Sequence, residues 1–276
     1  MSTKDLKQAI SSYTSQDLEQ RKRWYSPAAE AYNKTRPRYP EKLIQRVVEI
    51  AQLSSNSKIL EVGCGPGTAT VALAQYGFSM ICVEPNPDFY QLVQQNCASY
   101  PNVEIQNTSF EEWILETEKF DLVLAASSFH WIPLEVGYLK AANALRADGQ
   151  LILLWNMELQ PRYEVYQDLS EVYKVHAPSL ARYEEREDQE ESLRWLGQVV
   201  IDSGKFKELV SEQFECEVTY SVKDYLMLLS TYSPYLKLDS QSRDALFAGL
   251  REKIEQNYGG SLELSYLSAF HIARKH

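Results

Sequence analysis

Three glycines at alternate positions follow a short apolar run in the segment ILEVGCGPGT, residues 59–68. Gly63, Gly65 and Gly67 lack the Cβ atom that would hinder a tight bend and the close approach of a ligand to the main chain. A dinucleotide-binding fingerprint would need one more glycine where threonine stands in either register, which disfavours NAD and FAD. The segment therefore predicts a loop, between a strand and a helix, that holds a different nucleotide-type cofactor.

An acidic residue follows at the end of the next apolar run. Glu84 closes the segment SMICVE, residues 79–84. It lies about 20 residues after the first glycine, where a carboxylate can accept hydrogen bonds from both hydroxyls of an adenosine ribose. Pro85 and Asn86 come directly after it and are expected beside the same ligand. The alternative is a glycine turn that only joins a strand to a helix, but strand, loop, helix and acid stand in the order that a cofactor site requires.

The segment EVGCGPG, residues 61–67, resembles the first motif of class I S-adenosylmethionine-dependent methyltransferases. The resemblance implies S-adenosylmethionine as the cofactor, with S-adenosylhomocysteine as its product. It places Glu61 and Cys64 at the cofactor site together with the three glycines. It also implies an α/β fold built on a doubly wound, mostly parallel seven-stranded sheet, which is the Rossmann-like fold of these enzymes.

Residues 25–40 (YSPAAEAYNKTRPRYP) resemble the segment that folds over the cofactor in many small-molecule methyltransferases. The resemblance implies that Arg36 meets the methionyl carboxylate and that Tyr32 covers the sulfonium region, since arginine forms bidentate, charge-assisted bonds with carboxylates. The alternative is that Arg36 and Arg38 are ordinary surface charges beside two prolines.

Residues 103–113 (VEIQNTSFEEW) resemble the adenine-binding turn of the same family. Phe110 is expected to flank the adenine ring, and Ser109 to accept from the adenine amino group. The family often has aspartate at the position of Ser109, and a serine hydroxyl is the weaker acceptor. Trp113 fits better as a core residue on a short helix.

A histidine lies in the loop after the apolar run at residues 120–126, in FDLVLAASSFHWIP, residues 120–133. Ligand sites of open α/β sheets lie outside the carboxyl ends of the strands, so Ala126 and Ser127 are expected at the cofactor and His130 at the methyl acceptor. His130 could deprotonate a hydroxyl or amine, or orient a carboxylate as an imidazolium. The alternative is a histidine that only holds a neighbouring loop.

These residues need a frame of alternating strands and helices, and the first half of the chain has that pattern. Strands are predicted to include Ile59–Val62 and to lie near residues 79–84, 102–107, 120–126 and 149–155. Helices are predicted from Pro40, over 68–76, from Asn86 and Pro87, and over 133–147. We therefore expect residues 1–156 to form an N-terminal lid segment and the cofactor-binding α/β core.

The alternation is lost after Trp155, and the second half is rich in tyrosine. Residues 157–204 and 221–260 read as helical insertions that form a cap, so residues 157–276 combine this cap with the last two core strands, near 212–220 and 264–273. The segment YLMLLSTYSPY, residues 225–235, resembles the substrate side of the trans-aconitate methyltransferase-like branch. Its tyrosines at helical spacing can equally be packing.

Composition restricts the partners. The chain has 276 residues, a net charge of −10 and four cysteines without metal-ligand spacing, so neither nucleic-acid binding nor a metal site is expected. It has no apolar run of about 20 residues and no signal-peptide pattern, which predicts a cytoplasmic protein without a membrane segment. The oligomeric state cannot be predicted.

The motifs together predict a methyltransferase that acts on a small molecule. A non-catalytic S-adenosylmethionine-binding module remains an alternative, and cofactor binding without turnover would identify it. Aminopropyl transfer is less favoured because serine, phenylalanine and histidine at residues 127–130 stand where an acidic cluster for a polyamine would be expected. An NAD-dependent oxidoreductase is disfavoured by the glycine spacing.

Overall fold

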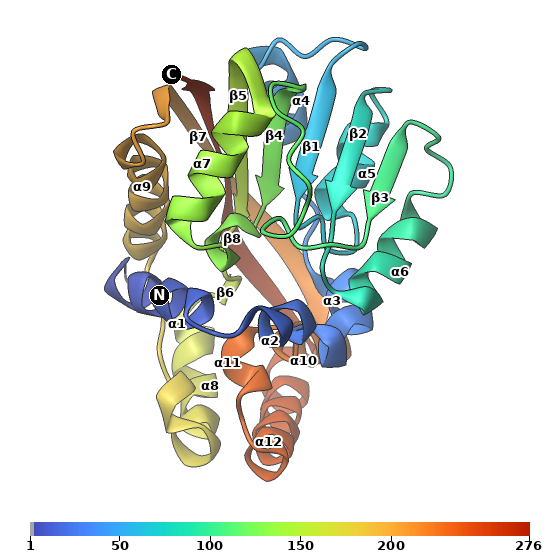
Figure 1. The fold of residues 1–276 in the computed structure, drawn as a ribbon. Helices are drawn as coiled ribbons and strands as arrows, with labels where there is room; N and C mark the ends of the chain where they lie inside the picture. The colour runs from blue at the N-terminus through green and yellow to red at the C-terminus, as the bar shows by residue number, and fades with distance from the viewer. Residues whose placement is uncertain (1–2) are drawn as a thin grey trace.

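The computed structural model describes residues 3–276 and contains one mixed, eight-stranded β-sheet (Figure 1). The order is β3-β2-β1-β4-β5-β8-β6, and β7 pairs with β8 outside this path. Strands β1 to β5 are parallel, whereas β8 is antiparallel to β5, β6 and β7. The strands are β1 Lys58–Val62, β2 Ser79–Val83, β3 Val103–Gln106, β4 Phe120–Ala126, β5 Leu145–Asn156, β6 Gln160–Pro161, β7 Phe206–Ser221 and β8 Ser261–Lys275. The α/β class and the mostly parallel, Rossmann-like sheet are confirmed, and the two-residue β6 adds one strand to the predicted seven.

Helices cover both faces of the sheet and its carboxyl-terminal edge. The α-helices are α1 Thr3–Thr14, α2 Leu18–Arg23, α3 Ala29–Thr35, α4 Glu41–Ile50, α5 Thr68–Ala74, α6 Pro87–Asn96, α7 Leu134–Ala144, α8 Tyr163–His176, α9 Arg186–Asp202, α10 Val222–Leu229, α11 Ser233–Leu236 and α12 Ser240–Tyr258. Short 3₁₀ helices are η1 Ser26–Ala28, η2 Phe129–Trp131 and η3 Pro178–Leu180. Asn86 caps α6 as predicted, because its side chain accepts from the amides of Asp88 and Phe89.

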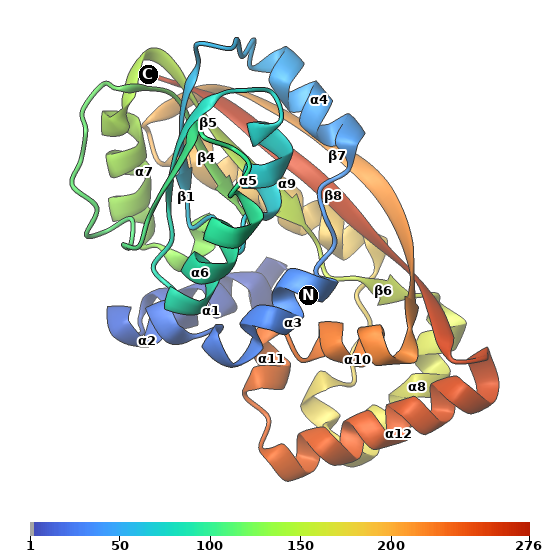
Figure 2. The ribbon, with the colours of Figure 1, turned by 90° about the vertical axis from the view of Figure 1, so that its right-hand side faces the viewer.

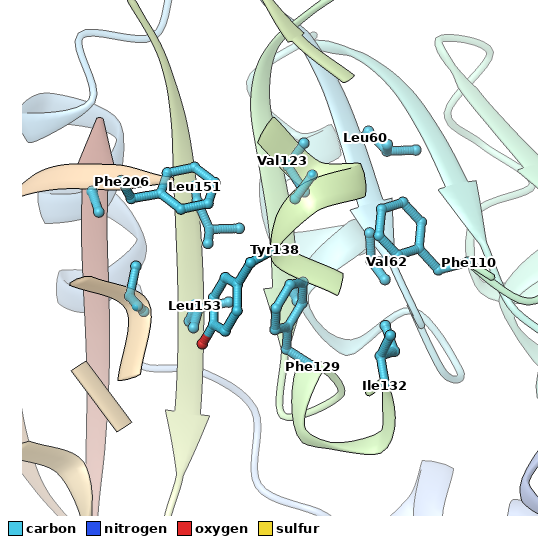
Figure 3. Close-up of a cluster of buried hydrophobic side chains, with 14 of the residues drawn as sticks. Leu60, Val62, Phe110, Val123, Phe129, Ile132, Tyr138, Leu151, Leu153 and Phe206 are labelled. Carbon is cyan, nitrogen blue, oxygen red and sulfur yellow. The ribbon is translucent and has the colours of Figure 1, made fainter. Parts of the chain in front are cut away.

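Two apolar clusters, one on each face of the sheet, form the main core. Figure 3 shows one of them, in which Phe129 and Tyr138 pack over β4 and β5 together with Phe206. The other cluster contains Leu43 of α4 and Leu73 of α5. Successive residues of a strand point to opposite faces, so β4 contributes to both clusters and is almost wholly apolar.

A third cluster lies in the cap, which consists of α8, α10, α11 and α12 (Figure 2). Leu169 of α8, Leu250 of α12 and Leu226 of α10 are buried there. Helix α9 differs from the expectation that residues 157–204 belong to the cap. It packs on β7 and β8 through Leu193 and Val200, so it covers the sheet.

The N-terminal helices α1, α2 and α3 cross the carboxyl ends of the parallel strands, between the sheet and the cap (Figures 1 and 2). Helix α1 contacts both η2 and α9. The ends of the strands, the N-terminal helices and the cap therefore surround one region.

Candidate active site

A cavity of about 310 Å³ lies where these three parts meet. Its volume is in the range of small-molecule sites, which enclose roughly 300–1,000 Å³. Most of the predicted site residues line it, from five separate segments: Tyr32, Arg36, Gly63, Cys64, Gly65, Glu84, Pro85, Asn86, Ser109, Phe110, Ala126, Ser127 and His130. Glu61 and Gly67 are the two that do not.

The glycine loop joins β1 to α5 and has the conformation that its glycines predict. Gly63, Gly65 and Gly67 all have positive φ values, of 64°, 57° and 89°. A Cβ atom on Gly63 would lie 2.8 Å from Cβ of Ser128, and one on Gly67 would lie 2.9 Å from Val93. No atom lies within 4 Å of a Cβ built on Gly65, so this side of the loop is open. The loop is thus packed closely at two glycines and leaves room for a ligand at the third.

Glu84 is held at the end of β2 by two backbone amides. Its Oε2 accepts from the amide of Gly65 at 2.7 Å, and its Oε1 accepts from the amide of Asn86 at 2.8 Å. Burial raises the pKa of Glu84 to about 7. Each carboxylate oxygen has a second lone pair, so both can still accept from a ribose hydroxyl. This donor and acceptor arrangement fits the ribose of S-adenosylmethionine.

Glu61 lies beneath the loop rather than in the cavity. Its side chain is fully buried and its Oε2 accepts from the hydroxyl of Thr70, in the first turn of α5, at 2.7 Å. Burial raises the pKa of Glu61 to about 8. In this structure Glu61 supports the loop from below. Cys64 lines the cavity, and the neighbouring Cys82 together with burial raises the pKa of its thiol.

Ser109 and Phe110 lie on the side of the cavity beyond Glu84. The hydroxyl of Ser109 donates to Glu112 at 2.9 Å and also accepts from the amide of Glu112. Phe110 is 2% exposed and its ring stacks with that of Trp113 at 6.2 Å. Trp113 belongs to the apolar core, as predicted. A flat ring beside Phe110 would therefore meet an apolar wall and a serine oxygen.

Arg36 connects the N-terminal segment to the cap. Its Nε and Nη2 donate to the hydroxyl and the carbonyl of Thr231, at 2.8 and 2.9 Å. Its guanidinium lies over the rings of Tyr32 and Tyr232, at 4.9 and 3.9 Å. Its Nη1 has no described partner, and Glu158 is the carboxylate near enough to favour its charged form. A bidentate bond to a methionyl carboxylate would require Arg36 to leave Thr231.

The loop after β4 carries Ser127 and His130. Ser127 has a φ of 53°, which is uncommon for a non-glycine residue, and its hydroxyl is 3.0 Å from that of Tyr39. His130 lies in η2, near the rings of Tyr13 and Trp155. Burial lowers the pKa of His130 to about 4, and its Nδ1 has no hydrogen-bond partner among residues 3–276. The ring is therefore neutral at physiological pH, which favours a base over an imidazolium.

Several lining residues were missed by the sequence analysis. Trp155 and Glu158 lie at and just beyond the end of β5, and Tyr13 and Arg21 come from the N-terminal helices. Trp155 is 6% exposed, and its Nε1 also lacks a partner in the described chain. The carboxyl end of β5 was a signal that could have identified the first two.

Hydrogen bonds connect the N-terminal helices to the α/β core and to the cap. Arg21 donates to Glu111 at 2.7 Å and to the carbonyl of Trp131 at 2.6 Å. Trp24 donates from Nε1 to the hydroxyl of Ser233, in the cap, at 3.1 Å. These contacts close the cavity over both the cofactor side and the acceptor side.

The described residues were also searched for a metal site and for a membrane-spanning helix. No group of three or more histidine, cysteine, aspartate or glutamate side chains that could hold a metal ion occurs within residues 3–276. Over the same residues, none of the helices combines the length and the apolar character needed to cross a membrane.

The structure is that of a Rossmann-like α/β protein with a cavity at the carboxyl ends of its parallel strands, where ligand sites of such folds lie. A methyltransferase-domain family model matches residues 59–149, from β1 to the start of β5. An uncharacterized methyltransferase-like protein of Schizosaccharomyces pombe is 27% identical over 80% of this chain and 82% of its own length. A probable S-adenosylmethionine-dependent methyltransferase of Saccharomyces cerevisiae is 25% identical over 70% of this chain and 66% of its own length. The chain spans about half the length of an uncharacterized Mycobacterium tuberculosis methyltransferase to which it is 29% identical, over 48% of this chain.

A solved structure of a putative type II methyltransferase from Anaeromyxobacter dehalogenans has the same fold. It has a TM-score of 0.65 and 21% identity, over 87% of this chain and 97% of that one. The matched domain and the relatives support a class I S-adenosylmethionine-dependent methyltransferase with S-adenosylmethionine as its cofactor, and the solved structure supports the fold. The trans-aconitate-like branch stays a prediction.

Proposed function

We propose that this methyltransferase acts on a small-molecule acceptor and that His130 is its general base. The observation that carries the proposal is one cavity that holds the glycine loop and Glu84 together with His130. The N-terminal helices and the cap close over it, which favours an acceptor small enough to be enclosed.

The residues that line the cavity fit the cofactor that the family implies. Glu84 would hold the ribose, Phe110 and Ser109 the adenine, and Arg36 with Tyr32 the methionyl end. S-adenosylmethionine supplies a methyl group on a sulfonium, a leaving group that needs no protonation. Asn86 contributes by fixing α6 beside Glu84, and its amide group also donates to Ser26 of the N-terminal segment.

The chain's own part in the reaction is positioning and proton transfer. The neutral ring of His130 can take the proton that an acceptor hydroxyl or amine loses as it attacks, a contribution of about 10²–10⁴ in rate. The N-terminal helices cover part of the cavity, and the surrounding rings of Tyr13, Trp131 and Trp155 restrict how the acceptor can lie.

Isothermal titration with S-adenosylmethionine, S-adenosylhomocysteine and NAD tests the site. Micromolar binding of the two adenosyl compounds without NAD binding is expected. Formation of S-adenosylhomocysteine in the presence of small carboxylic acids, phenols and amines then tests turnover. Cofactor binding without turnover on any of them would favour the non-catalytic module instead.

A further inference from the structure

A second, smaller cavity of about 50 Å³ adjoins the main one on the cap side. The two cavities share a wall, which consists of Glu158, Leu159, Arg182, Glu184 and Pro234. The far side of the small cavity is formed by four tyrosines of the cap, from α8, α10 and α11, namely Tyr166, Tyr173, Tyr225 and Tyr235. We call this second cavity the tyrosine subsite. Its volume suits a small polar group and not a ring, because one water molecule needs at least about 10–15 Å³ on this measure.

Glu158 is the charged residue of the shared wall whose partner is missing. Its carboxylate forms no hydrogen bond or ion pair with any residue from 3 to 276, and only its backbone carbonyl accepts, from Gln189. Arg182, in contrast, is exposed and forms an ion pair with Asp5 at 3.8 Å. Glu184 receives a hydrogen bond from Gln189 at 3.5 Å. Glu158 is half-buried at the wall of both cavities, and its carboxylate oxygens can accept from a donor on a ligand that fills the site.

The tyrosine hydroxyls of the subsite can accept more hydrogen bonds than they can donate to a ligand. The hydroxyls of Tyr173 and Tyr235 are 2.8 Å apart, so one of their two protons is used within the pair. Tyr232, on the main-cavity side, accepts from the amide of Leu159 at 3.4 Å. Burial raises the pKa of Tyr173 and of Tyr235, so both stay neutral and add no negative charge. A ligand group with several N–H donors and a positive charge matches this set.

Arg36 is near enough to Glu158 to interact with it electrostatically, but it has other direct partners. Arg36 is held by Thr231 and lies over the Tyr232 ring, so it does not enter an ion pair with Glu158. In the proposed function Arg36 serves the methionyl carboxylate. The charge of Glu158 is therefore available to the methyl acceptor.

We propose that Glu158 and the tyrosine subsite bind a protonated amine on the methyl acceptor, at the end away from the reacting atom. This inference rests on the proposed function, because it takes the main cavity as the site of methyl transfer. The acceptor class is then a small amine whose hydroxyl or second amino group lies at His130. The resemblance of residues 225–235 to the trans-aconitate-like branch would favour a carboxylate acceptor instead.

The test is a binding comparison on the protein saturated with S-adenosylhomocysteine. Three probes share one phenol ring and differ in charge: tyramine, 4-ethylphenol and 3-(4-hydroxyphenyl)propionate. Titration calorimetry on the wild type is expected to show tyramine binding at least 10-fold more tightly than either of the others. Glu158→Gln should lower tyramine affinity about 10-fold and remove its advantage over 4-ethylphenol. Glu158→Lys should reverse the preference in favour of the propionate.

Two further variants separate the charge of Glu158 from a general change in surface charge and from the subsite hydroxyls. Glu164→Gln removes a charge from an exposed position on α8, outside both cavities, and should change no probe affinity. Tyr173→Phe removes one hydroxyl of the subsite without changing charge, and should weaken tyramine binding several-fold.

Tighter binding of the propionate to the wild type, no binding of any probe at millimolar concentration, or tyramine affinity unchanged in Glu158→Gln would overturn the inference. A loss of S-adenosylhomocysteine affinity in Glu158→Gln would also overturn it, because Glu158 would then hold the methionyl ammonium. Failure of the wild type to bind S-adenosylhomocysteine would instead contradict the proposed function.

Discussion

The two sides of the cavity are built differently. The cofactor side comes largely from one continuous stretch, residues 58–113, where Glu84 is held by the amides of Gly65 and Asn86 and only Oε1 of Glu61, beneath the loop, is buried without a described partner. The acceptor side is assembled from the N-terminal helices, η2, the end of β5 and the cap. There the Nδ1 of His130 and the Nε1 of Trp155 have no partner within residues 3–276. The cofactor side is therefore preorganised by its own contacts. On the acceptor side, the ring nitrogens of His130 and Trp155 are free to form hydrogen bonds with a ligand.

The largest effect is expected on the acceptor side. His130→Gln should lower the rate of methyl transfer by about 10²–10⁴, because the base is lost, and should leave S-adenosylhomocysteine affinity unchanged. Steady-state kinetics with an identified acceptor checks this. His176→Gln, at the end of α8 and outside both cavities, is the matched control. The wild-type rate should depend on His130 protonation only below about pH 5, because its pKa is about 4. A limb near pH 6.5 that vanishes in His130→Gln would contradict the buried, neutral ring.

On the cofactor side, Gly63→Ala should lower S-adenosylmethionine affinity on the order of 100-fold. The new Cβ would lie 2.8 Å from Ser128 and would also require a positive φ. Gly77→Ala is the control, since Gly77 has a φ of 80° but open space around it. It should cost about 1 kcal/mol of folding stability and no affinity. Calorimetric titration distinguishes the two, and equal affinities would mean that close packing at Gly63 is unimportant.

Glu84→Ala should weaken cofactor binding by about 1–3 kcal/mol, because both ribose acceptors and the contacts to Gly65 and Asn86 are lost. Glu104→Ala, on the exposed side of β3, should bind normally. The same titration measures both variants. Unchanged affinity in Glu84→Ala would remove it from the ribose site.

The smallest effect is expected from Glu61, which lies beneath the glycine loop, and it concerns the free energy of unfolding. The folded-state pKa of Glu61 is raised from 4.5 to about 8, so its contribution to stability is fully present below about pH 4.5 and is lost as the pH rises to about 8. Glu84 acts in the same direction up to about pH 7. Glu61→Gln cannot ionise, and should be more stable relative to wild type at pH 8 than at pH 5, by roughly 1–3 kcal/mol. Urea unfolding at the two pH values measures this. A constant difference would show that Glu61 does not titrate in this range.

Much of the fold was predictable because its strands follow local rules. The apolar run 120–126 matches β4, and the strand predicted at 264–273 lies within β8. The layer to which α9 belongs was not predictable. Its buried Leu193 and Leu196 give the ordinary spacing of an amphipathic helix, and that spacing does not say which surface the helix covers.

Some residues of the site could likewise be predicted from the sequence, and others could not. Gly65 and Glu84 could be placed together from sequence, because adjacent parallel strands end at the same edge of a sheet. Glu61 was expected at the cofactor and lies below the loop, since strand alternation and the turn after it send its side chain toward Thr70. Trp155, Glu158 and Tyr13 meet only through long-range packing of the cap and the N-terminal helices, which no local pattern encodes.

The long hairpin of β7 and β8 carries the helices α10, α11 and α12 as an insertion at its tip. Its strands pair from Phe206 with Lys275 as far as Ser221 with Ser261, and α10, α11 and α12 all lie between these last two residues. The insertion therefore leaves and re-enters the sheet at facing positions, as a short turn would. Such a segment can be exchanged as one block without a break in the ladder below it. A chimaera that receives the corresponding block of a relative should keep its fold and cofactor and acquire a new choice of acceptor.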